Sequence, residues 1–374
     1  MAIKNTLNES DAKLALAAWL ARQQYHEDAT SVEIINIEIP HASGLSAITV
    51  LFTARWHRGG EITDRNLVAR CVPRSGGVFE HCDLRREYIL FKALSDEGSV
   101  PIPKPLGIET EDDSALGAPF FIMERVDGQI ARDDPPYTVQ GWVTDLSVED
   151  RGLLSHHALS ALAAIHAVDY KKLGLSHLDD SGAGAPQLAI KVAALKRYFK
   201  WAAAGQSNPV IEKGLDWLEQ NIPEHENEPV ISWGDARLGN MIINDDLSVA
   251  AVIDWEMVGL GCREIDLAWW IFVQRFHTVA IEVEVPAGIP SEQEVVARYT
   301  ELTGYTPQNL EYYILFAAVR LSVILVRLAN IMIAEGLFGE DTPMARNNPA
   351  LKLLALGLGM DGLEGELEYF VGNR

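Results

Sequence analysis

Three oxygen-bearing side chains in the middle of the chain have the types and spacing that phosphoryl transfer requires. Asp235 and Asn240 are separated by four residues, within the stretch WGDARLGN at 233–240. Asp254 follows the apolar stretch AAVI at 250–253. An aspartate, an asparagine five residues later and then a second aspartate form the order of a kinase catalytic loop and its metal-binding aspartate.

This spacing has a chemical purpose. Transfer of a γ-phosphoryl group needs an acceptor hydroxyl held in line and neutralisation of the charge on the triphosphate. The Asp235 carboxylate could position the hydroxyl and accept its proton, while the Asn240 amide oxygen and the Asp254 carboxylate could reach one Mg²⁺, which prefers hard oxygen ligands. Asp and Asn are also common in turns, so each residue alone could be a loop residue. The three together favour a catalytic site.

The preceding part of the chain predicts a mainly antiparallel sheet with one inserted helix over residues 30–126. Residues 9–22 are typical of an amphipathic helix, and alternation at 35–39 indicates a half-buried strand. The predicted hairpin at 47–72 has its turn at Gly59-Gly60, and the inserted helix covers 85–94. Three prolines at 101–105 predict an extended connection, and a last strand covers 119–123.

After Gly128 the pattern changes to helices. A helix begins near Ser147, which could form a capping box with Asp150. The further predicted helices cover 191–204, 209–222, 265–277, 291–303, 308–336 and 347–358. The stretch 241–254 contains two apolar runs around a polar turn and predicts a single hairpin. The fold class is therefore α+β, with a β-rich lobe at 1–126 and a larger, mainly helical lobe at 127–374 that contains the catalytic hairpin.

Three motifs carry a resemblance to a known family. They are WGDxRxxN at 233–240, VIDWE at 252–256 and DLAW at 266–269. Over about residues 40–335 the chain resembles the aminoglycoside phosphotransferase/choline kinase superfamily, and particularly its branch related to the kinase-like domain of certain acyl-CoA dehydrogenases. The resemblance implies a protein-kinase-like bilobal fold with a nucleotide-binding N-lobe, and an enzyme that uses ATP and Mg²⁺ to phosphorylate an alcohol group of a small molecule.

The same resemblance implies roles for individual residues. Asp235 would be the catalytic base, with Arg237 beside it in the catalytic motif, and Asn240 and Asp254 would be the metal ligands. Asp266 would brace the catalytic loop without touching substrate.

The chain departs from the family at Trp233, where a loop-supporting histidine is usual. Tryptophan offers one N–H donor and a large apolar face, so the substitution puts the bracing of the loop, and with it the shape of the acceptor pocket, in question.

For nucleotide binding, the resemblance implies a cation on the third strand that pairs with a glutamate on the inserted helix. No lysine occurs between Lys13 and Lys92, so Arg70 takes the cation's place and Glu87 is the expected partner. The arginine fork can bind phosphate oxygens in a bidentate way. The alternatives are a solvated strand end for Arg70 and an exposed helix residue for Glu87.

The loop at 41–47 would cover the phosphates, with Ser43, Gly44 and Ser46 presenting donors. A plain hairpin turn is the alternative there.

The hinge would follow the last strand of the N-lobe. Backbone groups at about Glu124 and Val126 would contact adenine, and Met123 would line the pocket. Met123 could equally be an ordinary core residue.

Composition limits the partners. The formal net charge of -22 opposes binding to nucleic acid and to anionic membranes. We expect a cytoplasmic protein, because the three cysteines include no C-x-x-C pair and no signal peptide is visible. The most apolar stretch of the chain is interrupted by Arg320 and Arg327. These two arginines either pair structurally with carboxylates or line an anionic-substrate pocket. The histidines at 156, 157 and 166 lack zinc-site spacing.

The acceptor stays open at this stage. Aromatic residues in the C-terminal helices and the acyl-CoA dehydrogenase branch favour a lipophilic or hydroxyacyl alcohol, and an aminoglycoside is the alternative. A non-catalytic nucleotide-binding protein is a further alternative, favoured by Trp233, the single glycine of the phosphate loop and the missing strand lysine. The complete set of Asp235, Asn240 and Asp254 opposes it. The sequence does not predict the oligomeric state.

Overall fold

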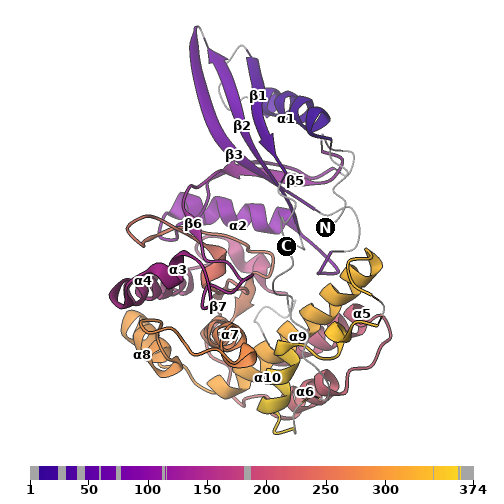
Figure 1. Ribbon diagram of the computed structural model, residues 1–374. Coiled ribbons are helices and arrows are strands. Elements are labelled where there is room, and N and C mark those ends of the chain that lie inside the picture. The colour runs from indigo at the N-terminus through magenta and orange to yellow at the C-terminus, as the bar shows by residue number, and fades with distance from the viewer. Residues whose placement is uncertain are drawn as a thin grey trace. The chain divides into compact units, whose positions relative to one another are not determined.

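The computed structural model describes residues 8–23, 31–39, 47–58, 60–72, 77–111, 114, 116–180, 187–339, 341–360 and 363. The chain forms two compact units (Figure 1). The first comprises Met1–Gly98 and Ile102–Val126, and the second comprises Ser99–Pro101 and Asp127–Arg374. Each unit is described by itself below.

The first unit contains a five-stranded antiparallel sheet with the strand order β1-β2-β3-β5-β4. Its elements are α1 (Glu9–Gln23), β1 (Ser31–Glu38), β2 (Ile48–Arg58), β3 (Glu61–Cys71), α2 (Leu84–Glu97), β4 (Pro105–Glu109) and β5 (Phe120–Glu124). The long β2–β3 hairpin and the inserted helix are confirmed. In β2, alternate side chains from Val50 to Trp56 are buried, and they join Leu16 and Trp19 of α1 in one core cluster.

One helix and one edge strand complete this unit. Asp83 caps α2 by accepting from the Arg86 N–H at 3.0 Å, and Phe91 of α2 packs edge-on against Phe121 of β5 at 5.4 Å between ring centroids. The connection expected at 101–105 contains no helix, and its last residue, Pro105, begins β4, a strand that the sequence did not predict. Proline is compatible with this position because it is the first residue of an edge strand.

The second unit is mainly helical. Its helices are α3 (Trp142–Asp145), α4 (Val148–Ala167), α5 (Leu188–Ala202), α6 (Pro209–Gln220), α7 (Arg263–Phe276), α8 (Glu292–Thr303), α9 (Leu310–Ala334) and α10 (Pro349–Gly357). Its strands are β6 (Gln129–Ile130), β7 (Val230–Ser232), β8 (Met241–Ile243), β9 (Val249–Val252) and β10 (Gly259–Gly261). Every predicted helix is present. Ser147 caps α4 at the Asp150 N–H, and its hydroxyl donates to the Asp150 carboxylate at 2.8 Å.

The prediction of a single hairpin in this unit is wrong. Strand β6 adds to the β8–β9 hairpin, and β7 pairs with β10 in a second small sheet. These extra strands have two or three residues each, too few to show an alternating pattern in the sequence. Gly128 allows β6 to lie so close to β8, because a Cβ atom there would come within 2.6 Å of the Ile242 side chain.

Helix α9 forms much of the core of this unit and packs against α5, α6, α7 and α10. By length and composition alone it could cross a membrane, but 61% of its most apolar stretch is buried inside the structure. Such burial is typical of a core helix in a folded domain.

Candidate active site

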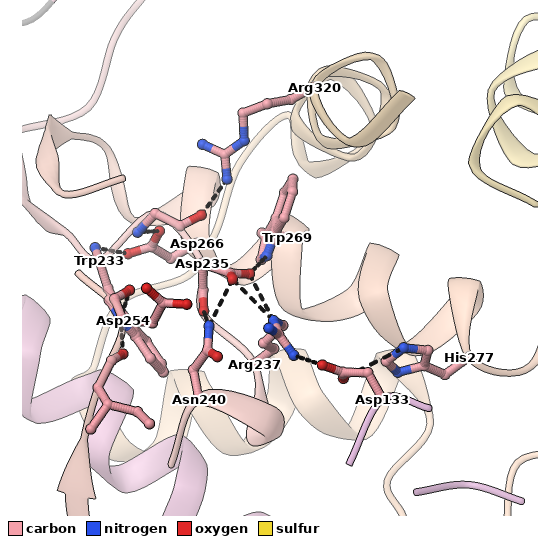
Figure 2. Close-up of polar contacts among 12 residues, drawn as sticks. Asp133, Trp233, Asp235, Arg237, Asn240, Asp254, Asp266, Trp269, His277 and Arg320 are labelled. Atoms are coloured by element: carbon pink, nitrogen blue, oxygen red, sulfur yellow. Dashed lines mark hydrogen bonds and ion pairs between the residues drawn. The ribbon is translucent and has the colours of Figure 1, made fainter. Parts of the chain in front are cut away.

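The loop between β7 and β8 carries two of the three predicted residues. Asp235 follows β7, and Asn240 ends the short 3₁₀ turn Leu238–Asn240, directly before β8. Asp254 comes two residues after β9, with a positive φ of 61°. The Ile253 N–H donates to the Asn240 carbonyl at 3.0 Å, which brings the end of the hairpin back to the loop. Asp235, Asn240 and Asp254 therefore lie together (Figure 2).

Three side chains donate to the Asp235 carboxylate. Trp269 Nε1 lies 2.7 Å from Oδ1, and Asn240 Nδ2 lies 2.7 Å from Oδ2. Arg237 Nε lies 3.0 Å from both oxygens. The Asp235 side chain is 15% exposed. Its orientation is thus fixed by donors from the loop and from α7, while a part of it stays accessible.

The donor set at Asn240 and Asp254 fits Mg²⁺. Because Asn240 uses its Nδ2 on Asp235, its Oδ1 is left for a cation, and the Asp254 side chain lies beside it (Figure 2). Within the part of the chain that the structure describes, no group of three or more His, Cys, Asp or Glu could hold a metal ion. One amide oxygen and one carboxylate, completed by water and phosphate oxygens, is a donor set typical of Mg²⁺ at phosphoryl-transfer sites.

Asp266, in the first turn of α7, braces the start of the loop. It accepts from the Ser232 hydroxyl at 2.8 Å and from the N–H groups of Trp233 and Gly234 at 2.7 and 2.9 Å. His166 Nε2 of α4 lies 3.1 Å from Asp266 Oδ2, the oxygen that also accepts from the Trp233 N–H. Burial alone would raise the pKa of Asp266, but these hydrogen bonds, His166 first, outweigh it and hold the pKa below its ordinary value.

Trp233 itself contributes to the bracing, which answers the question raised by its presence. Its indole is fully buried and its Nε1 donates to the carbonyls of Ile253 and Asp254 at 3.1 and 3.2 Å. The indole therefore ties the catalytic loop to the end of the hairpin. Next to it, Gly234 has a φ of 93°, and a Cβ atom there would lie 2.3 Å from the Met257 carbonyl oxygen.

Sequence reasoning missed two residues of the site, Asp133 and His277. Arg237 Nη1 contacts the Asp133 carboxylate, and His277 Nε2 lies 3.6 Å from Asp133 Oδ1. Burial lowers the pKa of His277 to about 4, against an opposing effect of Asp133, so the imidazole is neutral at pH 7. No sequence spacing connects residue 133 to residue 237, and no motif in the sequence includes Asp133.

Two carboxylates beside Arg237 stabilise the charge of its guanidinium. Burial alone would lower the pKa of its guanidinium, but the carboxylates of Asp235 and Asp133 outweigh burial and raise it above its ordinary value. Arg237 is therefore a permanent cation between two anions.

Arg320 and Arg327 contact aromatic rings. The Arg320 guanidinium lies 4.1 Å from the centre of the Trp269 ring and donates to the Gly234 carbonyl, while Arg327 lies 4.2 Å from the centre of the Trp201 ring. Burial lowers the pKa of Arg320 to about 10, which leaves it charged at neutral pH. Arg320 thus holds the indole that donates to Asp235, a role that neither sequence interpretation included.

In the first unit, the predicted pair of Arg70 and Glu87 is formed. Arg70 on β3 lies 3.1 Å from Glu87 Oε1 and 3.2 Å from Oε2, and both side chains are largely buried. The alternatives of a solvated strand end and an exposed helix residue are therefore wrong. A fixed guanidinium on the third strand is the geometry that a phosphate contact would require.

The other predicted nucleotide contacts are only partly described. Met123 and Glu124 end β5, and the Glu124 N–H donates to the Lys104 carbonyl at 2.9 Å. Glu124 would therefore offer adenine its carbonyl oxygen, and Val126 follows two residues later. Ser43, Gly44 and Ser46 lie outside the described residues.

Comparison with known proteins gives one family. The model of the family described as "Phosphotransferase enzyme family" matches residues 41–288. Acyl-CoA dehydrogenase family member 11 of Pongo abelii is 32% identical over 226 residues, which cover 59% of this chain and 27% of that protein. The chain thus spans about a quarter of the length of this curated relative.

Solved structures share the fold. A protein of Ralstonia eutropha JMP134 assigned as an aminoglycoside phosphotransferase superposes with a TM-score of 0.69 at 22% identity, covering 92% of this chain and 98% of that one. Aminoglycoside phosphotransferase APH(4)-Ia, in a ternary complex with AMP-PNP and hygromycin B, gives a TM-score of 0.55 at 13% identity, with the same coverages. At these identities the likeness establishes the kinase-like α+β fold alone.

Proposed function

The chain belongs to the phosphotransferase enzyme family, and we propose that it is a kinase that transfers the γ-phosphoryl group of ATP to a hydroxyl of a small molecule. The observation that supports this most is the joint geometry of Asp235, Asn240 and Asp254, because an oriented carboxylate and a pair of oxygen ligands lie in one place. A decayed kinase that only binds nucleotide would not need all three.

In this proposal Asp235 is the general base. Its carboxylate is held by Trp269, Asn240 and Arg237, so that its remaining accessible edge can orient the acceptor hydroxyl and accept the proton. Such base catalysis contributes roughly 10²–10⁴-fold in rate. Asn240 and Asp254 would hold Mg²⁺, which neutralises phosphate charge when bound.

ATP binding is proposed for the first unit. The pair of Arg70 and Glu87 supports it, since Glu87 fixes the guanidinium that would contact the α- and β-phosphates. The backbone after β5 would contact adenine. The relative solved with AMP-PNP supports a nucleotide as the phosphoryl donor.

For the acceptor we propose a lipophilic or hydroxyacyl alcohol. The curated relative is named as an acyl-CoA dehydrogenase family member, which supports an acceptor of this class. An aminoglycoside acceptor is the alternative, from the solved relatives of the same fold.

The test is turnover by Asp235→Asn, with Asp245→Asn as the matched control. Asp245 is an exposed residue in the turn of the same hairpin, so its variant removes an equal charge away from the site. We expect Asp235→Asn to lose about 100-fold or more of its ADP release while ATP still stabilises it against heating. A variant that keeps most of its turnover with a true acceptor would contradict the role of Asp235.

A further inference from the structure

We propose that Asp133 is a positioning residue that holds Arg237 so that this arginine does not close on the catalytic base. The inference rests on the proposed role of Asp235 as the base. It starts from an asymmetry in the contacts of Arg237, whose Nε approaches both oxygens of Asp235 at 3.0 Å while its Nη1 contacts Asp133 instead.

The asymmetry matters because arginine and carboxylate prefer a fork-shaped pair with two parallel N–H···O bonds. Arg237 makes no such pair with Asp235, because only the Nε of its guanidinium approaches that carboxylate while the Nη1 arm contacts Asp133. If that arm were released, the guanidinium could turn and present two nitrogens to Asp235. The carboxylate already accepts from Trp269 and Asn240, so a closed fork would occupy the acceptor sites that a substrate hydroxyl needs.

The segment that carries Asp133 is fixed on both sides, while the Asp133 side chain itself is 41% exposed. Asp133 follows β6, whose pairing with β8 fixes where the segment begins. Its Oδ1 is buried and makes no hydrogen bond among the described residues, and it faces His277 Nε2 at 3.6 Å. The Thr138 hydroxyl donates to the His277 carbonyl at 2.6 Å, which ties the same segment to the end of α7.

Two of the three donors to Asp235, Trp269 and Arg237, are therefore linked to α7 or its C-terminal end. Trp269 donates to Asp235 directly, whereas His277, eight residues and about two turns later, contacts Asp133, which holds Arg237 (Figure 2). The helix that braces the loop through Asp266 would thus also set the position of Arg237.

Gly239 provides a second, independent way to disturb the same contact. A Cβ atom at this position would lie 2.4 Å from Arg237 Nη1 and 3.0 Å from Asp133 Oδ1. The φ of Gly239 is not in the left-handed region, so the close approach of these two side chains, and of the Ala131 carbonyl oxygen at 3.1 Å, is what requires glycine there. Gly239→Ala should therefore displace Arg237 without changing any charge.

The kinetic test is a double-mutant cycle of Asp133→Asn and Arg237→Met, with Mg-ATP as substrate, water as acceptor and ADP release as readout. If Asp133 acts through Arg237, Asp133→Asn lowers kcat by about 10-fold and leaves KM for ATP within about twofold, and its effect disappears in the Arg237→Met background. Asp133→Glu, which keeps the carboxylate, should recover part of the loss. Asp145→Asn, an exposed aspartate of α3, is the matched control.

A second readout does not depend on activity. The indole N–H resonance of Trp269, identified by its loss in Trp269→Phe, reports on the hydrogen bond to Asp235. We expect Asp133→Asn and Gly239→Ala both to shift this resonance, and Asp145→Asn to leave it in place.

The outcomes separate this inference from the proposed function. A full effect of Asp133→Asn in the Arg237→Met background, or an unshifted Trp269 resonance in both variants, would overturn the positioning role. If the wild-type protein hydrolyses no ATP, which transfer to a small-molecule hydroxyl does not require, the Trp269 resonance alone decides whether Asp133 positions Arg237, and the proposed function is tested separately with an acceptor hydroxyl.

Discussion

Acidification is expected to destabilise the second unit through the buried imidazole of His277. Its side chain is buried and lies edge-on to the Tyr137 ring at 5.6 Å, and burial lowers its pKa from 6.5 to about 4 although Asp133 opposes the shift. The unfolded chain therefore binds a proton between pH 6.5 and about 4 that the folded chain excludes. Stability is lost as the pH falls through this window.

The magnitude follows from the two pKa values. At pH 5 the unfolded imidazole is almost fully protonated and the folded one almost neutral, so the linkage relation gives a loss of about 2 kcal/mol between pH 7 and pH 5. The full effect, below both pKa values, is about 3 kcal/mol.

Urea unfolding at pH 7, 6 and 5 measures this directly, and seven of the nine tryptophans lie in the second unit and report its unfolding by fluorescence. His277→Phe keeps the ring packing and removes the titration. Between pH 7 and pH 5 its free energy of unfolding should therefore fall by about 2 kcal/mol less than that of the wild type. His156→Gln, at an exposed position of α4, is the control and should behave as wild type. Equal pH dependence in wild type and His277→Phe would refute the reasoning.

Three further predictions concern the bracing of the two sites. Asp266→Asn should lower the free energy of unfolding at pH 7 by about 3 kcal/mol, measured by urea unfolding. The reason is the loss of the carboxylate that accepts hydrogen bonds from Ser232 and two backbone N–H groups. Since its pKa lies below the ordinary value, this stabilisation should persist above about pH 4 and fade as the pH falls through the lowered folded-state pKa. Gly234→Ala should lower the free energy of unfolding by on the order of 1–3 kcal/mol from backbone strain alone. It should also abolish turnover, because the Met257 carbonyl must move. A stable and active variant would contradict this geometry. Arg70→Lys should raise KM for ATP about tenfold with little change in kcat, as lysine lacks the fork; an unchanged KM would argue against a phosphate contact.

The sequence predicted the architecture well where the patterns are long. The β2–β3 hairpin and the helices α4 to α10 show a clear period of two or of about 3.6 residues, and the motif around Asp235 located the catalytic loop. The strands β6, β7 and β10 were missed because two or three residues carry no period. Their place is fixed instead by close packing such as that at Gly128.

Within the site, local spacing identified residues that lie on one loop or follow one hairpin. It could not identify contacts that depend on how distant segments meet. Asp133 reaches Arg237 over about a hundred residues of chain, and His277 lies at the end of a helix whose first turn alone carried a motif. Trp269 was recognised as part of a motif, but its bond to Asp235 follows only from the position of α7 against the loop.

The most direct test of the central claim is transfer of the terminal phosphoryl group itself. Purified protein would be incubated with Mg²⁺, ATP labelled with ¹⁸O in the γ-phosphoryl group, and a panel of hydroxyacyl compounds, lipophilic alcohols and aminoglycosides, and the products weighed by mass spectrometry. We expect a labelled phosphate ester of a hydroxyacyl or lipophilic alcohol that is absent with Asp235→Asn. Nucleotide binding without any labelled ester across the panel would contradict this expectation and favour a non-catalytic protein.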